Sequence, residues 1–349
     1  MAGVPRRHEN HEDRMRRLLA PLIVLALILG GLWLGGESLL AQQLRRIAAQ
    51  EPMAALGAAQ ELRDPRRIGV RVSALELQTG AGRIELPQAE LWLTPLRPTT
   101  LRLALPPRAV LDPGSGPLEL GLADATARLR VQPLNGLGMA SAGISAGVLT
   151  IEGTELAKGL QADAELAALD ANAPPDAAAA YDLDLTLDDL EPGLFATLPL
   201  PGRLSMNATG RVWLDALPRP STLTPDLAPL PVGLQLDDAE LRLGAVQARI
   251  LGRVEADTQG RAQGRVVLYT RDAKPLLQAA ATAGLIPPKV VTLAGTMLKN
   301  ISDLPLPENA GFSFPPPAEG ELRLPLSFAD GKTSLGPVVL GPAPAFPRR

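Results

Sequence analysis

The sequence predicts a mainly β protein of the α+β class. An N-terminal transmembrane helix is followed by a large, mostly antiparallel, curved sheet of about 13 strands with two covering helices. Three observations lead to this prediction. A long uncharged run lies near the N-terminus, and apolar and polar residues alternate over most of the chain after Arg67. The 349 residues also include 35 prolines and 33 glycines, which suit short strands joined by turns better than a helical bundle.

The uncharged run predicts a membrane anchor. It spans Leu18 to Leu34 and is extended by two glycines. At 1.5 Å per residue it forms about 26–29 Å of helix, just enough to cross the hydrocarbon core of a bilayer. We predict a transmembrane signal-anchor helix over residues 18–40, with Leu18, Leu25 and Leu34 in the membrane. Two alternatives stay open: a cleaved signal peptide, whose apolar stretch is usually about 7–15 residues long, and a buried helix of a soluble protein.

Charges on either side of the run predict its orientation. Arg14, Arg16 and Arg17 precede it and Glu37 follows it. By the positive-inside rule, residues 1–17 form a cytoplasmic tail, the membrane is crossed once, and everything after about residue 40 lies outside the cytoplasm. Residues 41–64, rich in Ala, Gln, Leu and Arg, are predicted to form a helical linker, and residues 65–349 a β-rich domain.

The alternation after Arg67 has a period of two, the pattern of strands with one apolar face. In the segment 181–188, for example, Leu183 and Leu185 alternate with Asp182 and Asp184. Such alternation indicates antiparallel sheet with one solvated face. Segment 159–170 also suits a helix, because it is rich in Ala and Leu, and we predict it as a strand. The predicted strands are 68–78, 83–94, 99–105, 117–132, 144–152, 159–170, 181–188, 204–214, 233–243, 246–257, 261–271, 320–329 and 332–340.

Two helices and three long connections interrupt the strands. One helix is predicted from Lys274 to Gly284, where a glycine and two prolines end it, and the second from about 288 to 301. Both are expected to cover one end of the sheet. Segments 171–180, 217–231 and 304–317 are rich in Pro or Ala and are either long loops or a divide between two halves of the sheet.

Residues Gly143 to Gly147 match the G-x-S-x-G pattern of the nucleophile elbow of serine hydrolases, with Ser145 as the nucleophile. A serine hydroxyl needs a base to become a good nucleophile. The only histidines, His8 and His11, precede the anchor and lie across the membrane from Ser145 in the predicted topology. The residues that follow the pattern favour a strand rather than a helix. We therefore interpret it as a turn that leads into a strand, and catalysis at Ser145 as the weaker alternative.

The other chemical motifs are also weak. Asp182, Asp184, Asp188 and Asp189 form the densest acidic cluster, which suits a solvated strand face better than a calcium site. Asp330-Gly331 between two alternating runs predicts a type I′ hairpin turn, although Gly331-Lys332-Thr333 is similar to the end of a phosphate-binding loop. The chain has no cysteine and a net charge of −3. We expect no metal, no cofactor and no nucleic acid.

Several stretches of the sequence carry a family resemblance. They are LWLTPLRPTTLRLALPP (91–107), RLRVQPLNG (128–136), AAAAYDLDLTLDDL (177–190), GRVWLD (210–215), VGLQLDDAELRLG (232–244), GRVEADTQGRAQGRVVLYT (252–270), AGLIPPKVV (283–291) and SFADGKTSLGPVVLGPAP (327–344). They resemble an uncharacterised, membrane-anchored periplasmic protein family of proteobacteria, known as a domain of unknown function, over most of residues 65–345. The resemblance implies a single-pass anchor in the bacterial inner membrane with the bulk of the chain, residues 65–349, in the periplasm, and it implies no catalytic or binding residues. The layout of one anchor and a long sheet is also similar to AsmA-like envelope proteins, which are associated with lipid movement or membrane organisation.

These observations favour a non-enzymatic protein of the cell envelope. Aromatic residues make up only 3% of the chain, and two predicted helices are few for about thirteen strands, so part of the sheet is expected to stay uncovered. We expect the apolar sheet face to bind phospholipid beside the inner membrane. The alternative is that the sheet closes on itself, in which case the domain is an interaction module for other envelope proteins.

Overall fold

The computed structural model describes most of the chain beyond residue 53. Within the described residues, 19 strands form one sheet, and every strand pair is antiparallel. The predicted mainly β, antiparallel architecture is confirmed. The described residues are 54–64, 66–79, 82–114, 116–192, 202–219, 222, 227–244, 246–282, 291, 298–303, 306 and 312–348.

The strands are short to medium in length and follow one another closely along the chain. They are β1 (Ala54–Glu61), β2 (Ile68–Thr79), β3 (Gly82–Thr94), β4 (Arg97–Ala104), β5 (Arg108–Asp112), β6 (Leu118–Leu122), β7 (Thr126–Gln132), β8 (Gly138–Ala146), β9 (Leu149–Ile151), β10 (Thr154–Ala157), β11 (Gly159–Ala167), β12 (Ala179–Leu190), β13 (Leu204–Leu214), β14 (Pro231–Leu243), β15 (Val246–Ala256), β16 (Ala262–Thr270), β17 (Leu322–Ala329), β18 (Lys332–Leu335) and β19 (Val338–Pro342).

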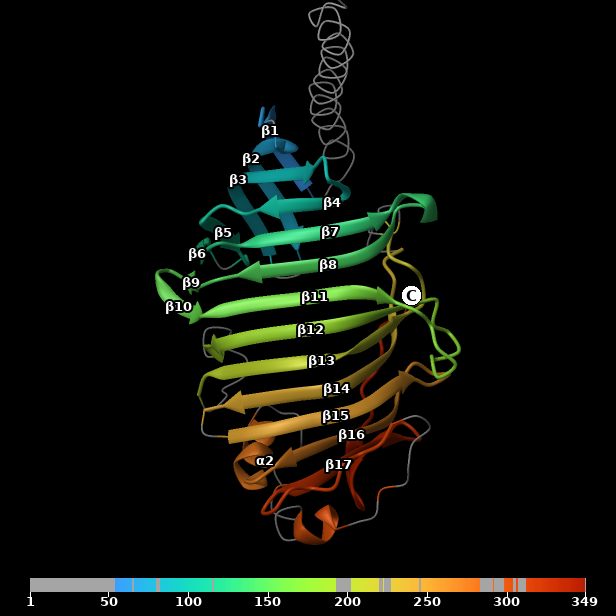
Figure 1. Ribbon diagram of the computed structural model, residues 1–349. Helices are drawn as coiled ribbons and strands as arrows, with labels where there is room; N and C mark the ends of the chain where they lie inside the picture. Colours follow the sequence, from blue (N-terminus) through green and yellow to red (C-terminus); the bar gives the residue numbers. More distant parts are fainter. Residues whose placement is uncertain are drawn as a thin grey trace, which may run out of the picture.

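Most strands pair with their neighbours in sequence, so the sheet grows in one direction along the chain. The main path runs β1-β2-β3-β4-β7-β8 and then β11 through β19 in order. A side branch of short strands leaves β3 and runs β5-β6-β9-β10. Figure 1 shows β7, β8 and β11–β17 stacked in this order down the molecule, with β1–β4 above them.

The sheet has more strands than the sequence predicts because turns fall inside the predicted runs. The predicted strand 117–132 is divided into β6 and β7 by a turn at 123–125, and 332–340 is divided into β18 and β19. Strands β5 and β10 have only five and four residues, too few for an alternating pattern to stand out. The ambiguous segment 159–170 forms strand β11, as predicted.

The helical linker predicted over residues 41–64 is wrong where the structure describes it. Residues 54–61 form strand β1, which pairs with β2. Alanine favours helix in isolation, but here the backbone groups bond to β2 and Ala59 packs on the buried Val70 and Val72. The sheet therefore begins at Ala54, before the predicted domain start at residue 65.

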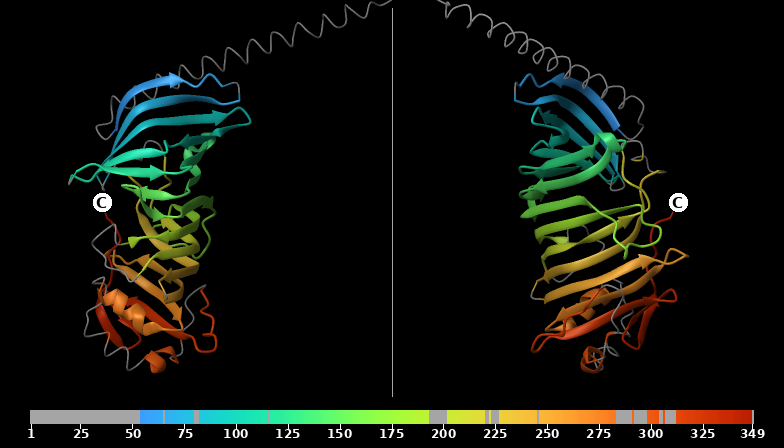
Figure 2. Two further views of the ribbon diagram at one scale, coloured as in Figure 1. Left: turned by 90° about the vertical axis from the view of Figure 1, so that its left-hand side faces the viewer. Right: turned by 45° about the vertical axis from the view of Figure 1, so that its right-hand side comes forward.

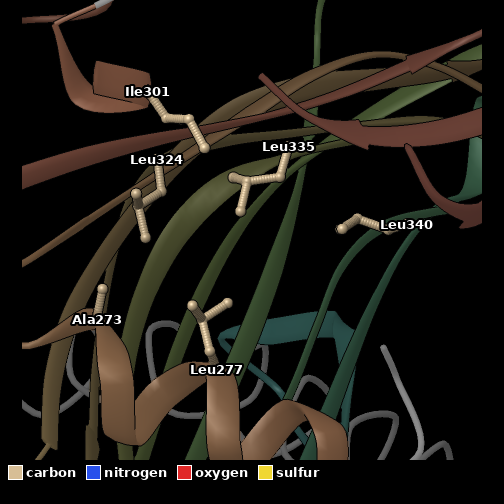
Figure 3. Packing of buried hydrophobic residues seen from close by; sticks show 6 residues of the cluster. All are labelled: Ala273, Leu277, Ile301, Leu324, Leu335 and Leu340. Atoms are coloured by element: carbon tan, nitrogen blue, oxygen red, sulfur yellow. The ribbon is translucent and has the colours of Figure 1, made fainter. Parts of the chain in front are cut away.

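Helix α2 (Ala273–Thr282) packs at the β16–β19 end of the sheet. It begins within one residue of the predicted start, with Pro275 in its first turn, where a missing N–H is tolerated. Figure 3 shows Ala273 and Leu277 of this helix facing Ile301, Leu324 and Leu335, and Figure 2 places the helix on one side of the sheet. Residues 298–302 are also helical, and most of the second predicted helix lies outside the described residues.

The opposite side of the same strands carries a second cluster. Leu251, Val267 and Tyr269 are buried there against Phe312 and Phe314. The Tyr269 hydroxyl donates a hydrogen bond of 2.8 Å to the Pro315 carbonyl. The end of the 304–317 connection therefore runs over the sheet as a loop. Because the sheet continues from β12 through β17 without a break, the proline-rich and alanine-rich segments do not divide it into halves.

The hairpin predicted at Asp330-Gly331 is confirmed. Ala329 pairs with Lys332, and the two turn residues have φ of 52° and 69°, as a type I′ turn requires. In the part of the chain that the structure describes, no helix is both long and apolar enough to span a bilayer.

Candidate functional site

One face of the sheet is apolar without interruption across eight strands, β8 and β11–β17. Alternate residues point to one face, so residues paired in register form rows across the strands. Two adjacent rows contain only apolar residues, and at about 4.8 Å per strand each row extends about 34 Å. We call this surface the apolar face. Its rows are Ile144, Ala162, Leu185, Ala208, Ala239, Ile250, Leu268 and Leu324, and Ala142, Ala164, Leu183, Gly210, Leu236, Gly252, Val266 and Leu326.

Exposure of the apolar face differs along its length. At the β17 end, Leu324 is only 3% exposed because the buried cluster with α2 packs on it. At the β8 end of the same row, Ile144 is 47% exposed. Leu183 and Leu185 between them are partly exposed. The cluster takes its strand residues from β16–β19. The row residues on β8, β11 and β12 are partly or largely exposed, whereas Gly210 on β13 and Ala239 on β14 are buried.

The described ends of the connection between β13 and β14, residues 215–219 and 227–230, lie at one end of the strands. The Met139 N–H of β8 donates to the Pro218 carbonyl at 2.8 Å. The base of the connection is fixed because the Leu230 N–H donates to the Asp215 carboxylate at 2.8 Å. Tyr181, beside this connection, is 1% exposed and its hydroxyl donates to the Met139 carbonyl at 2.7 Å. The described ends of the predicted loop 217–231 are thus held by hydrogen bonds.

Burial raises the pKa of Tyr181 from its ordinary value of 10.0 to about 12, and it raises the pKa of Tyr269 as well. The chain has only two tyrosines. We expect an absorbance titration of the folded protein to show no tyrosinate at the ordinary pKa. Because the folded protein holds these protons more tightly, their contribution to stability is complete below pH 10 and decreases between about pH 10 and 12. Ionisation of both tyrosines near pH 10, with the near-ultraviolet circular dichroism unchanged, would contradict the burial.

Two glycines in the second row allow neighbouring backbones to approach closely. A Cβ at Gly210 would overlap the Gln235 carbonyl oxygen, and one at Gly252 would overlap the Arg265 carbonyl oxygen. The register shifts by one residue beside Gly210 and again between β14 and β15. Bulges and glycines of this kind bend sheets. The curvature of the apolar face therefore depends on these positions.

The opposite face carries ion pairs that bridge neighbouring strands. Arg128 pairs with Asp163 at 2.7 Å across the intervening strand β8, and Arg130 pairs with Glu165 at 2.9 Å in the same way. Arg211 pairs with Asp182 at 2.7 Å. We call this surface the polar face. The contrast between the two faces explains why the strands alternate so regularly in sequence.

A buried tryptophan fixes the 168–178 connection on the polar face. Trp213 is 1% exposed, and the Arg253 guanidinium lies 4.5 Å from the centre of its ring. Arg253 also pairs with Glu255 and donates to the Asn172 carbonyl of that connection. This cation–π contact and its hydrogen bonds stabilise the connection. These contacts lie on the polar face and not on the apolar face.

The interpretation of Gly143 to Gly147 as a turn is wrong for most of its length. Residues 143–146 lie in strand β8, and only Gly147 and Val148 form the bend before β9. Ser145 is exposed on the polar face, where its hydroxyl lies 2.9 Å from that of Thr126. A Cβ at Gly143 would overlap the Arg128–Asp163 ion pair, which explains the first glycine of the pattern. The geometry is that of a strand, without the sharp strand-to-helix turn of a nucleophile elbow.

Two of the four acidic residues of β12 form ion pairs. Asp182 bonds Arg211, and Asp189 bonds Lys158 at 2.6 Å. The bond from Lys158 lowers the pKa of Asp189. Asp184 and Asp188 are exposed on the polar face, as the period of two predicts. Among the described residues, no three side chains of the metal-binding types lie close enough to hold an ion together.

The predicted anchor and its flanking charges lie outside the described residues. This applies to the transmembrane residues Leu18, Leu25 and Leu34 and to the topology-determining residues Arg14, Arg16 and Arg17, together with His8 and His11.

Two hollows were not predicted from the sequence. One, of about 310 Å³, contains Trp92, Arg102, Arg128 and Ser145. The other, of about 1210 Å³, lies at one end of β12–β16 and includes the exposed side chains of Asn207, Glu240 and Arg249. These residues come from strands whose alternation was recognised. The sequence carries no signal of which residues would be opposite one another, because register depends on turn lengths and bulges.

The comparison with protein families identifies a relationship over nearly the whole sheet. A family described as an uncharacterized protein conserved in bacteria (DUF2125) matches residues 38–344, and the chain belongs to this family. The resemblance to an uncharacterised bacterial family is thus confirmed. No curated protein and no solved structure matches the chain.

Proposed function

We propose that this DUF2125 protein is a non-enzymatic, inner-membrane-anchored protein of the periplasm that binds phospholipid acyl chains on its apolar face, in maintenance of the cell envelope. One observation carries the proposal: the change in exposure along a single apolar row. Leu324 is buried under the α2 cluster, whereas Ile144, seven strands away in the same row, is 47% exposed.

The size and shape of the apolar face support an elongated apolar ligand. The two rows are continuous, their part on β8, β11 and β12 is partly or largely exposed, and exposed apolar patches mark binding surfaces. The cluster at β16–β19 closes one end of the apolar face, and the Met139–Pro218 hydrogen bond holds the start of the connection after β13 beside β8. A flexible acyl chain suits such a surface because it needs continuous apolar contact and no specific hydrogen bonds.

The test is mass spectrometry of lipids extracted from residues 54–349, which contain all strands of the sheet, purified without detergent from bacterial periplasm. We expect phospholipid in stoichiometric amount. A monodisperse domain that is free of lipid and retains a protein partner would overturn the lipid proposal in favour of an interaction module for envelope proteins.

The anchored topology rests on the uncharged run at 18–34 and on the arginines before it. The arrangement of one anchor and a long sheet is similar to AsmA-like envelope proteins. We expect a reporter that is active only in the cytoplasm to give no signal when fused after Arg349, and a strong signal when fused after residue 17. A strong signal from the C-terminal fusion would contradict the topology.

The non-enzymatic proposal is supported by the surroundings of Ser145. Its hydroxyl neighbour is Thr126, and it lies in an extended strand. We expect a fluorophosphonate probe to leave Ser145 unlabelled in the purified protein. A fluorophosphonate probe that labels Ser145 in the purified protein, with the label absent from Ser145→Ala, would establish the hydrolase alternative.

A further inference from the structure

The hollow of about 310 Å³ at β3, β4, β7, β8 and β11 combines features of an anion site. Its volume lies at the lower end of the range for small-ligand pockets. The polar side chains of its lining are two arginines, one carboxylate, two hydroxyls and an amide. Those groups are Arg102, Arg128, Asp163, Thr126, Ser145 and Gln161.

Register places two positive charges opposite each other in this hollow. Arg102 of β4 pairs directly with Arg128 of β7. Like charges at such positions are unfavourable, because their Cβ atoms lie only about 5 Å apart. Arg128 is neutralised by Asp163 at 2.7 Å. Arg102 forms no ion pair with any acid in the described part of the chain, so the hollow retains one uncompensated positive charge.

The neighbouring hydroxyls supply a further donor. The oxygens of Thr126 and Ser145 lie 2.9 Å apart, so one hydroxyl proton is shared between them and the other remains available. Trp92, which pairs with Arg102 across β3 and β4, adds an aromatic ring to the lining. A guanidinium and a hydroxyl beside an aromatic ring suit an oxyanion attached to an organic group.

We propose that this hollow is a binding site for the phosphate group of a small ligand, with Arg102 as its principal charge partner and the Thr126–Ser145 hydroxyl pair as a second donor. A phosphate has enough oxygens to accept from Arg102 and from a hydroxyl at the same time. The site lies on the polar face and is independent of the acyl-chain proposal. It gives Ser145 a role in binding.

The experiment uses the full chain in non-ionic detergent and titrates inorganic phosphate, then glycerol phosphate, in place of chloride at constant ionic strength. Binding is followed by calorimetry and by tryptophan fluorescence, with Trp92→Phe to assign the signal. We expect Arg102→Ala to weaken binding at least about tenfold, as loss of a charged hydrogen bond predicts. Arg97→Ala is the matched control. It removes the same charge from the same strand at an exposed position outside the hollow, and we expect a change of less than about twofold.

If Arg102→Ala and Arg97→Ala weaken phosphate binding equally, the effect is one of general surface charge, and the proposed site is overturned. If inorganic phosphate, glycerol phosphate and phosphatidylglycerol mixed into the detergent micelles all fail to bind, the site is also overturned. If only phosphatidylglycerol binds, and Arg102→Ala abolishes that binding, the phosphate is that of a lipid headgroup. If the free compounds bind, the ligand is soluble. Because both side chains are exposed, we expect both variants to retain the fold. Thermal melts check this.

Discussion

Replacing Leu185 with glutamate is expected to remove phospholipid from the purified domain almost completely, with at least about a tenfold drop in bound lipid per protein. Leu185 lies in the first row of the apolar face between Ala162 and Ala208, and it is partly exposed. A carboxylate there would be desolvated by a bound acyl chain, which is unfavourable without a partner. In the absence of lipid it stays in water, so we expect a loss of only about 1–2 kcal/mol in the free energy of unfolding.

The next residue of the same strand supplies the control. Thr186→Glu introduces the same charge on the polar face, one residue away. We expect it to leave lipid occupancy unchanged. Equal lipid content in Leu185→Glu and Thr186→Glu, with both proteins folded by circular dichroism, would show that lipid binds elsewhere.

Replacing Gly210 with alanine is expected to reduce the free energy of unfolding by about 3 kcal/mol, which is the upper end for overpacking in a closely packed site. Gly210 is buried and lies at the register shift between β13 and β14. The added Cβ would overlap the Gln235 carbonyl oxygen and press on the Leu236 backbone. Backbone atoms cannot rotate away as a side chain can, so the two strands must separate. Denaturant unfolding measures the loss.

Gly341 is the control for that change. It lies in β19, and a Cβ added there meets no atom within 4 Å. We expect Gly341→Ala to change the free energy of unfolding by less than about 1 kcal/mol. Similar losses in the two variants would mean that the loss of glycine flexibility, and not the close approach at Gly210, determines the result.

The sequence predicted the parts of the fold that depend on local pattern. Alternation along β12 placed Asp182 and Asp184 on one face and Leu183 and Leu185 on the other, as the structure shows. The Asp330-Gly331 turn was also predictable, because few residues other than glycine and asparagine or aspartate adopt two successive positive φ angles. Helix α2 begins within one residue of the predicted start at Lys274.

Strand β1 and the G-x-S-x-G segment show where local pattern was insufficient. Alanine-rich residues 54–61 favour helix alone and become a strand because β2 offers them backbone partners and a buried surface. Gly143 to Gly147 suggests a turn until the Arg128–Asp163 ion pair is seen to pass over Gly143. Both contacts join residues far apart in the chain, so no sequence window contains them.

The sequence by itself determined that this chain forms a long antiparallel sheet with one apolar and one polar face, because side-chain direction alternates with a fixed period along any strand. Only the tertiary structure decided which part of the apolar face is covered, because α2 packs on Leu324 and leaves Ile144 exposed. It also decided that Arg102 lies opposite Arg128. The physical reason is the same in both cases. Covering and register depend on the turns, bulges and packing that join distant segments, and a change of one residue in any of them moves every side chain that follows.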